Sequence, residues 1–173
     1  MELYFLRHGK AVELNDSGAP DDFHRALTPR GMEEMRAEAE SLHLLGVRPD
    51  IILTSPLVRA QQTAAIVAQR LAPKKGLVET DLLAPDCDLN QLRKLLEQHT
   101  DCNSIILVGH EPDFSTLVGD LIGSHGARVE LKKGALAAVG VRGSVRSGGG
   151  LLQWLAPPKL LMQCTHSRPH NDD

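Results

Sequence analysis

The stretch SIILVGHEP, residues 104–112, decides the fold of this 173-residue chain. Its first five residues form a short apolar run, which predicts a strand buried on both faces of a sheet. Beyond the Gly-His-Glu-Pro turn, apolar residues recur at helical spacing and predict a helix that Gly123 ends; they are Leu117, Val118, Leu121 and Ile122. A buried strand that leads directly into a helix is the repeating unit of an α/β fold.

Two further units of this kind precede it. Residues 2–6 and residues 50–54 read as strands, and each is followed by a helix. The first helix is predicted from Thr28-Pro29 to Gly46 and the second from Ser55-Pro56 to about Leu71, because a capping residue followed by proline marks a helix start.

The rest of the chain adds weaker signals. Residues 77–80 predict a short strand and residues 89–99 a third helix, whereas 135–142 and 150–156 predict a strand pair around a Gly/Ser-rich turn. The whole order predicts an α/β three-layer sandwich: a mostly parallel central sheet with helices on both faces, whose last strands can run antiparallel at one edge.

We expect residues 1–158 to form a single domain and residues 159–173 a polar, frayed C-terminal tail. The formal net charge is −3 and the basic residues are scattered, so no nucleic-acid partner is expected. The chain has neither a signal-peptide pattern nor an apolar run long enough for a membrane span, which predicts a cytoplasmic protein without a membrane partner. We expect a monomer.

Three cysteines match no zinc or redox motif, and we expect free thiols: Cys87, Cys102 and Cys164. Cys164 lies with His166 and His170 in the polar tail, but their spacing supports no metal site. We therefore predict no metal and no cofactor.

The chemistry-bearing residues follow the predicted strands. Arg7 and His8 come directly after the first strand, Arg59 lies one helical turn beyond Ser55 after the second, and His110 follows the strand at 104–108. Because the carboxyl ends of parallel strands share one edge of a sheet, we expect these side chains to converge there.

Two arginines and two histidines suit a phosphoryl group. Guanidinium groups bind its charged oxygens through paired hydrogen bonds, and the helices after Ser55 and His110 are expected to add backbone donors at their N-termini. A neutral histidine can attack phosphorus in line, while the second histidine holds an oxygen of the phosphoryl group.

Three segments carry a resemblance to a known family: Leu-Arg-His-Gly at 6–9, Thr-Ser-Pro-Leu-Val-Arg-Ala-Gln-Gln-Thr-Ala at 54–64, and Val-Gly-His-Glu-Pro at 108–112. Together they resemble the histidine phosphatase superfamily of phosphoglycerate mutases and acid phosphatases, and most of all its small SixA-type phosphohistidine phosphatases. The resemblance covers roughly residues 1–158.

The resemblance implies roles for the residues that match these motifs. His8 is the expected nucleophile, Arg7, Arg59 and His110 are catalytic and complete the phosphate site, and Gly9 joins Arg7, Arg59 and His110 in binding substrate. It also implies that water then hydrolyses the phosphohistidine without a metal or a nucleotide.

The chain departs from larger members of that family, which carry an acidic proton donor in mid-chain. No acid stands at the expected place, although Asp81, Asp86 and Asp88 are near it and Glu111 follows His110. An alkoxide leaves poorly without a proton, and general-acid help is worth about 10²–10⁴-fold. An imidazole leaving from a P–N bond needs less help, so the departure favours a phosphohistidine substrate.

The short connection between the second helix and His110 leaves little chain for a lid, and an open site suits a phosphorylated protein such as a histidine phosphotransfer domain. Two alternatives remain: a broad small-molecule phosphomonoesterase, and a non-catalytic module that binds phosphohistidine or another anion.

Three positions have simpler interpretations. We interpret Ser55 as a helix cap, because no serine-hydrolase motif surrounds it. His24-Arg25, in the long loop 9–27, is interpreted as solvated charge rather than as a substrate contact. Glu111 can orient His110 or stabilise the following helix N-terminus, and the sequence does not decide between these roles.

Overall fold

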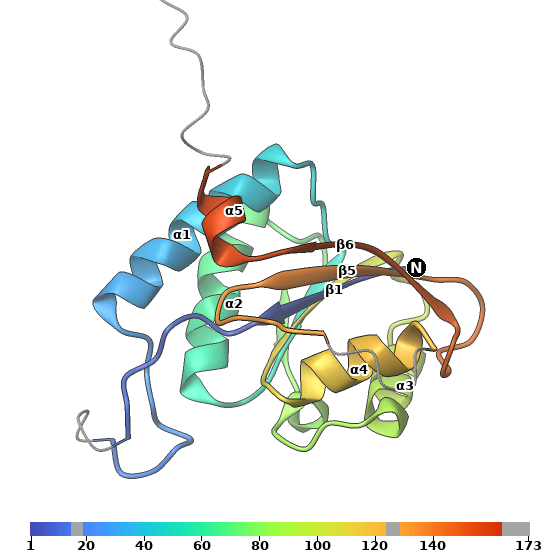
Figure 1. The fold of residues 1–173 in the computed structure, drawn as a ribbon, viewed down its shortest axis with the longest axis horizontal. Helices are drawn as coiled ribbons and strands as arrows, with labels where there is room; N and C mark the ends of the chain where they lie inside the picture. Colours follow the sequence, from blue (N-terminus) through green and yellow to red (C-terminus); the bar gives the residue numbers. More distant parts are fainter. Residues whose placement is uncertain (15–18, 124–128, 164–173) are drawn as a thin grey trace, which may run out of the picture.

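The computed structural model describes residues 1–14, 19–123 and 129–163 (Figure 1). Within these residues the chain forms one six-stranded sheet. The strands are Glu2–Arg7 (β1), Ile51–Thr54 (β2), Leu77–Glu79 (β3), Ser104–Gly109 (β4), Leu136–Val141 (β5) and Gly150–Ala156 (β6). Their order across the sheet is β3–β2–β4–β1–β5–β6.

Helices cover both faces of this sheet, as Figure 1 shows. The helices are Pro29–Leu44 (α1), Val58–Leu71 (α2), Leu89–Glu97 (α3), Asp113–Leu121 (α4) and Pro158–Gln163 (α5), with a 3-10 turn at Asp81–Leu83. Helices α1, α2 and α5 pack on one face and α3 and α4 on the other, so the predicted three-layer α/β sandwich is confirmed.

The sheet is mostly parallel. β4 pairs in parallel with both β1 and β2, and β2 pairs in parallel with β3, whereas β5 and β6 join antiparallel beyond β1. Arg7 lies opposite Gly109, and Thr54 lies opposite Val108. The carboxyl ends of β1, β2 and β4 therefore meet at one edge, as the sequence predicts.

Alternation along β1 divides the core into two layers. Leu3 and Phe5 pack with the α3–α4 side, whereas Tyr4 and Leu6 pack with the α1–α2 side. Phe5 also meets Phe114 of α4 edge to face, with 5.3 Å between ring centroids. Each fully buried side chain of this size contributes about 1.5–3 kcal/mol, so the central strands are held from both sides.

The end of the described chain differs from the expected frayed tail. Residues 158–163 form α5. Its Leu161 side chain is buried against the α1 side of the sheet, and the backbone carbonyl of Leu161 accepts a hydrogen bond from the hydroxyl of Ser41. Six residues are too few to show a helical period, so this helix could not be predicted from local patterns. The predictions for Cys164, His166 and His170 fall outside the described residues.

Within the described ranges no helix combines the length and the apolar character that crossing a bilayer requires. The same residues contain no cluster of three or more His, Cys, Asp or Glu side chains that could hold a metal ion. Cys87 and Cys102 are free and buried, as expected.

Candidate active site

The ends of β1 and β4 bring two histidines together. His8 follows β1, His110 follows β4, and their ring centroids are 5.2 Å apart. Both residues are buried, with 6% of the surface of His8 and 4% of that of His110 exposed to solvent. The convergence predicted from the strand order is therefore present, because neighbouring parallel strands in register end at the same depth.

The hydrogen bonds of His8 fix which ring nitrogen is available. Nδ1 lies 2.8 Å from the carbonyl oxygen of Gly9, an acceptor, so Nδ1 carries the proton. Nε2 is then the nitrogen with the lone pair, and it accepts a hydrogen bond of 3.2 Å from Nε of Arg59. The reactive nitrogen thus faces a guanidinium group.

Burial keeps both imidazoles neutral. Burial lowers the pKa of His8 to about 3, with smaller effects in the same direction from His110, Arg59 and Arg7. The pKa of His110 falls to about 4, mainly through burial and then through the charge of Arg59. At neutral pH the free protein therefore presents His8 as an uncharged base with an available lone pair.

Two buried polar atoms at this site have no hydrogen-bond partner in the described part of the chain: Nε of Arg7 and Nδ1 of His110. Arg7 uses NH1 to donate to the carbonyl oxygen of Leu131, at 2.8 Å. A buried polar group without a partner costs about 1–3 kcal/mol. An anion that accepted hydrogen bonds at this edge would relieve that cost.

Ser55 does not cap α2, so that interpretation is wrong. The helix begins only at Val58, with Leu57 as its N-cap residue and no side-chain cap. Ser55 instead lies at the end of β2, where its Oγ is 2.7 Å from Nε2 of His110 and accepts the N–H of Leu57 at 3.3 Å. Its hydroxyl orients His110 and leaves Nδ1 as the ring nitrogen for a ligand.

Gly9 accepts the hydrogen bond of His8 Nδ1 through its carbonyl oxygen, and its own N–H is bonded within the protein. Its N–H donates to Oγ1 of Thr63 at 3.1 Å, and that hydroxyl donates to the backbone oxygen of Arg59 at 2.8 Å. This chain of hydrogen bonds connects the backbone of His8 to the first turns of α2. The residue expected to bind substrate thus has its N–H engaged by the protein.

The N-termini of α2 and α4 present fewer free backbone N–H donors to an anion than the sequence predicts. At α2, the N–H of Val58 donates to the carbonyl oxygen of Phe23. At α4, the N–H of Ser115 donates to Oε1 of Glu111 at 3.0 Å. Glu111 therefore stabilises the first turn of α4, which is one of its two alternatives. Burial lowers the pKa of Arg7 and the charge of Glu111 opposes this shift, so Glu111 also acts on the site. Side chains dominate the anion-binding character of the site.

Asp22 is a site residue that the sequence analysis missed. Its backbone oxygen and its Oδ2 accept hydrogen bonds from NH1 and NH2 of Arg59, at 2.6 and 2.8 Å. Burial raises the pKa of Asp22, but hydrogen bonds from Arg25 and Arg59 outweigh it and the net shift is downward. Its position in a long loop was the available signal, since such loops often carry function.

His24 and Arg25 were expected to be solvated charge, and only Arg25 differs from that expectation. Arg25 donates through Nε to the carbonyl oxygen of Val12 at 2.7 Å and through NH1 to Oδ1 of Asp22 at 2.7 Å. His24 is exposed and bonded to Asp21. Arg25 thus holds the loop in place and orients Asp22, whereas His24 remains a surface group.

The candidate proton donors lie elsewhere. Asp88 caps α3 by accepting the N–H groups of Asn90 and Gln91. In the described part of the chain, the side chains of the two histidines and the two arginines are hydrogen-bonded to residues other than Asp81 and Asp86. The nearest carboxyl group bonded to these four residues is that of Asp22, which is ionised at neutral pH because its pKa is lowered.

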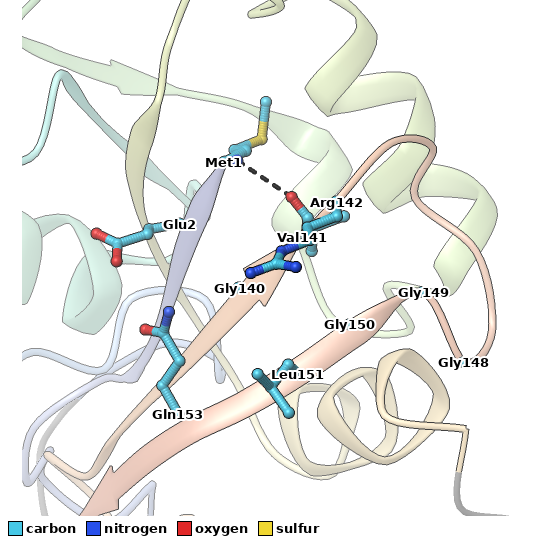
Figure 2. A pocket seen from close by; sticks show the side chains of 10 residues that line it. All are labelled: Met1, Glu2, Gly140, Val141, Arg142, Gly148, Gly149, Gly150, Leu151 and Gln153. Carbon is cyan, nitrogen blue, oxygen red and sulfur yellow. Dashed lines mark hydrogen bonds between the residues drawn. The ribbon is translucent and has the colours of Figure 1, made fainter.

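A second hollow lies at the opposite end of β1, near the N-terminus (Figure 2). It has a volume of about 410 Å³, and its ten lining residues include four glycines, with Glu2 and Arg142 as its charged side chains. Figure 2 shows no histidine there and the N-terminal amine of Met1 donating to Val141. Among these described residues, the histidines and arginines predicted to carry the chemistry lie at the carboxyl edge and not in this hollow.

Comparisons with known proteins agree with this geometry. The family model described as histidine phosphatase superfamily (branch 1) matches residues 3–84. An uncharacterised protein of Picosynechococcus sp. is 35% identical over 157 residues, which cover 88% of this chain and 89% of that protein. The mitochondrial serine/threonine-protein phosphatase Pgam5 of Drosophila willistoni is 36% identical over 76 residues, 44% of this chain but only 25% of Pgam5.

Solved structures extend the similarity to nearly the whole chain. The protein histidine phosphatase SixA, solved in complex with tungstate, superposes with a TM-score of 0.79 at 27% identity, covering 92% of this chain and 98% of SixA. A SixA structure from Agrobacterium tumefaciens gives a TM-score of 0.75 at 25% identity, covering 91% and 97%.

Proposed function

The chain belongs to the histidine phosphatase superfamily and has a SixA-like fold, and on this premise we propose that it hydrolyses phosphohistidine on a signalling protein, such as a histidine phosphotransfer domain, through a covalent phospho-His8 intermediate. The observation that carries the proposal is the state of His8: a buried, neutral imidazole whose Nδ1–H is held by Gly9 and whose Nε2 lone pair faces Arg59.

In the first step Nε2 of His8 attacks phosphorus, and the P–N bond to the substrate imidazole breaks. The phosphorylated His8 ring keeps its Nδ1 proton and becomes positively charged. The carbonyl oxygen of Gly9, 2.8 Å from Nδ1, stabilises that charge. The leaving imidazole already carries a proton on its other nitrogen and departs neutral.

The phosphoryl oxygens gain hydrogen bonds from groups that are preorganised in the free protein. Nε of Arg7 and Nδ1 of His110 are buried and unpartnered, and Nε of Arg59 points at the reacting nitrogen. Ser55 orients His110 for this contact. Donors fixed in a water-poor site stabilise transition-state charge more strongly than donors in water. Tungstate in SixA is a tetrahedral oxyanion and supports a phosphate-like ligand here.

In the second step water attacks phosphorus and the bond to Nε2 of His8 breaks. His8 leaves as a neutral imidazole because its Nδ1 proton was never removed, so the starting tautomer is regenerated. One proton of the attacking water goes to a phosphoryl oxygen, so that inorganic phosphate is released. None of the proposed steps calls for a metal or a nucleotide, and the prediction of a cofactor-independent enzyme is retained.

The acids of the site favour a P–N substrate over an alkyl ester. Asp22 is ionised at neutral pH and engaged by Arg59, so it holds no proton for an alkoxide leaving group. Asp88 and Glu111 are committed to helix N-termini. A substrate whose leaving group needs little protonation fits this arrangement, and phosphohistidine is such a substrate.

The test is hydrolysis of a ³²P-labelled histidine phosphotransfer domain by the metal-free protein, beside an aryl phosphate at equal concentration. We expect rapid loss of label from the domain, slow turnover of the aryl phosphate, and a fall of at least about 10⁴-fold in turnover for His8→Ala. Acid-labile ³²P trapped on the wild-type protein and absent from His8→Ala would identify the intermediate.

Three outcomes would contradict the proposal. Aryl phosphate turnover that equals or exceeds that of the domain would favour the small-molecule phosphomonoesterase. Hydrolysis that persists in full in His8→Ala would exclude the covalent mechanism, whereas binding without any turnover in the wild type would favour the non-catalytic module.

A further inference from the structure

A basic groove adjoins the candidate active site. It has a volume of about 560 Å³ and lies between the start of α1, the turn before β5 and the start of α5. Six cationic side chains line it against a single carboxylate, that of Glu34; the cations are Arg7, Lys10, Arg30, Lys132, Lys133 and Lys159. The chain as a whole carries a net charge of −3, so this is a local concentration of the opposite sign.

The groove keeps most of this charge. Glu34 lies between Lys10 and Arg30, 2.9 Å from each, and so offsets one positive charge of the pair. Lys133 is 3.7 Å from Glu13, at the edge of the ion-pair range. Lys132 and Lys159 are exposed to solvent on the two walls. Several uncompensated positive charges in a concave surface produce a focused positive potential.

Arg7 joins the groove to the site. It lines the groove, it directly precedes His8, and its NH1 donates to Leu131, next to Lys132. A partner that fills the groove therefore lies beside the phosphoryl-accepting nitrogen. Lys10, two residues beyond His8, also lines the groove and so provides a second connection between the groove and the site.

The lining favours a protein surface over a nucleic acid or a naked polyphosphate. Pro157, Pro158 and Met162 supply apolar area within the cationic rim, an arrangement typical of protein interfaces. The lining contains no aromatic ring on which a base could stack. An acidic surface with some apolar side chains matches both features of the groove.

We propose that the basic groove is the docking surface for the phosphoprotein substrate and that it selects a partner whose surface around the phosphohistidine is acidic. This inference rests on the proposed function and specifies its substrate class. Charge complementarity of this kind acts mainly on the association rate and on partner choice, so it raises kcat/KM for the protein without changing the chemistry at His8.

The test compares two double charge reversals. Lys132→Glu/Lys159→Glu changes the exposed walls of the groove and leaves Arg7 in place. The matched control, Lys94→Glu/Arg142→Glu, makes the same change in net charge at α3 and at the hollow of Figure 2. The substrates are a ³²P-labelled acidic phosphotransfer domain and an aryl phosphate, both at low ionic strength.

We expect the groove variant to lose about tenfold or more in kcat/KM for the domain and to change less than about twofold for the aryl phosphate. The control should change neither by more than about twofold, and high salt should reduce the difference between wild type and groove variant. Equal losses on both substrates, or equal losses in the groove variant and the control, would overturn the proposal.

A binding measurement separates this proposal from the proposed function. Binding of the unphosphorylated domain to wild type requires no turnover, and we expect the groove variant to weaken it about tenfold while the control does not. Unchanged binding would exclude the groove as the docking surface even if phosphohistidine is hydrolysed. Displacement of the domain by an oligonucleotide or by inorganic tripolyphosphate at equal charge concentration would show a general polyanion site and would also overturn the proposal.

Discussion

The two sides of the candidate site are held in different ways. Arg7 ends β1, His8 follows it and His110 follows β4. These two parallel strands lie in the middle of the sheet, and their register sets the separation of the three residues. Arg59 lies opposite them on α2, and its guanidinium group is bonded to Asp22, which belongs to the long loop 9–27. One side is fixed by the sheet and the other by a loop contact.

This difference indicates at which positions the site geometry survives the loss of a polar contact. The strand-end side, which consists of Arg7, His8 and His110, depends on the packing of the whole core, so its geometry persists when a single polar contact is lost. The loop side consists of Arg59 and Asp22. The loop side depends on a few hydrogen bonds, among them those from Arg59 to Asp22 and from Val58 to Phe23. Loss of one of these bonds should therefore alter the orientation of Arg59 without unfolding the protein.

The largest effect is expected on the strand-end side. In the proposed mechanism His110 donates to the phosphoryl group, so we expect His110→Ala to lower kcat about 10²–10³-fold. Ser55→Ala should cost less, because it removes only the hydroxyl that orients His110. Steady-state kinetics with the labelled phosphotransfer domain measures both. A Ser55→Ala variant as impaired as His110→Ala would show that the hydroxyl itself takes part in the reaction.

A smaller effect is expected on the loop side. Asp22→Ala should lower kcat about tenfold, because Arg59 loses the carboxylate that holds NH2 in place. KM should stay the same or fall, since a negative charge leaves the site. Asp22→Asn retains an accepting oxygen and should recover most of the loss, and Asp21→Ala, which changes the exposed pair with His24, is the matched control.

The opposite result would assign Asp22 a different role. If Asp22→Ala raised kcat/KM, the carboxylate would be an internal competitor of the phosphoryl group rather than a positioning residue. Equal kcat losses in Asp22→Asn and Asp22→Ala, with an unchanged melting temperature, would show that the charge matters and the hydrogen bond does not.

The smallest effect on activity is expected from Glu38, which is buried beneath the strand-end side. Its Oε2 has no hydrogen-bond partner in the described residues, and it packs against Gly134, whose N–H donates to the carbonyl oxygens of Arg7 and His8. Burial, together with the nearby charge of Glu34, raises the pKa of Glu38 to about 8.

The sign of the stability effect follows from this pKa. Below pH 4.5 the Glu38 carboxyl is protonated in both the folded and the unfolded protein, and its contribution to the free energy of unfolding is fully present. Between about pH 4.5 and 8 the carboxyl releases its proton in the unfolded protein but keeps it in the folded protein, so the free energy of unfolding falls as pH rises. Glu38→Gln removes this dependence. Between pH 5 and 8 the wild type should lose roughly 2–5 kcal/mol more unfolding free energy than the variant.

Urea unfolding at pH 5 and pH 8 measures this difference. His8 and His110, whose pKa values are lowered, have the opposite dependence below pH 6.5, but they do so equally in both proteins and cancel in the comparison. Parallel pH profiles for wild type and Glu38→Gln would mean that Glu38 is ionised in the folded protein. Activity at pH 6 should differ little between the two.

Local sequence patterns were sufficient to predict the architecture and the convergence of Arg7, His8, Arg59 and His110 at one edge of the sheet. Apolar runs such as residues 104–108 and capping pairs such as Thr28-Pro29 are local signals, because strand burial and helix starts depend on neighbouring residues. Parallel strands place their carboxyl ends at one edge by topology alone. The positions of His8 and His110 were therefore predictable without coordinates.

The partners that hold the side chains of these residues were visible only in the folded protein. Ser55 carries a helix-cap signature, but α2 begins three residues later, and only the packing of β2 beside β4 places its hydroxyl on His110. Asp22 reaches Arg59 across 37 residues of chain, and the basic groove combines side chains from α1, the turn before β5 and α5. Such contacts depend on where loops and helix ends are held in space, and no local pattern encodes that distance.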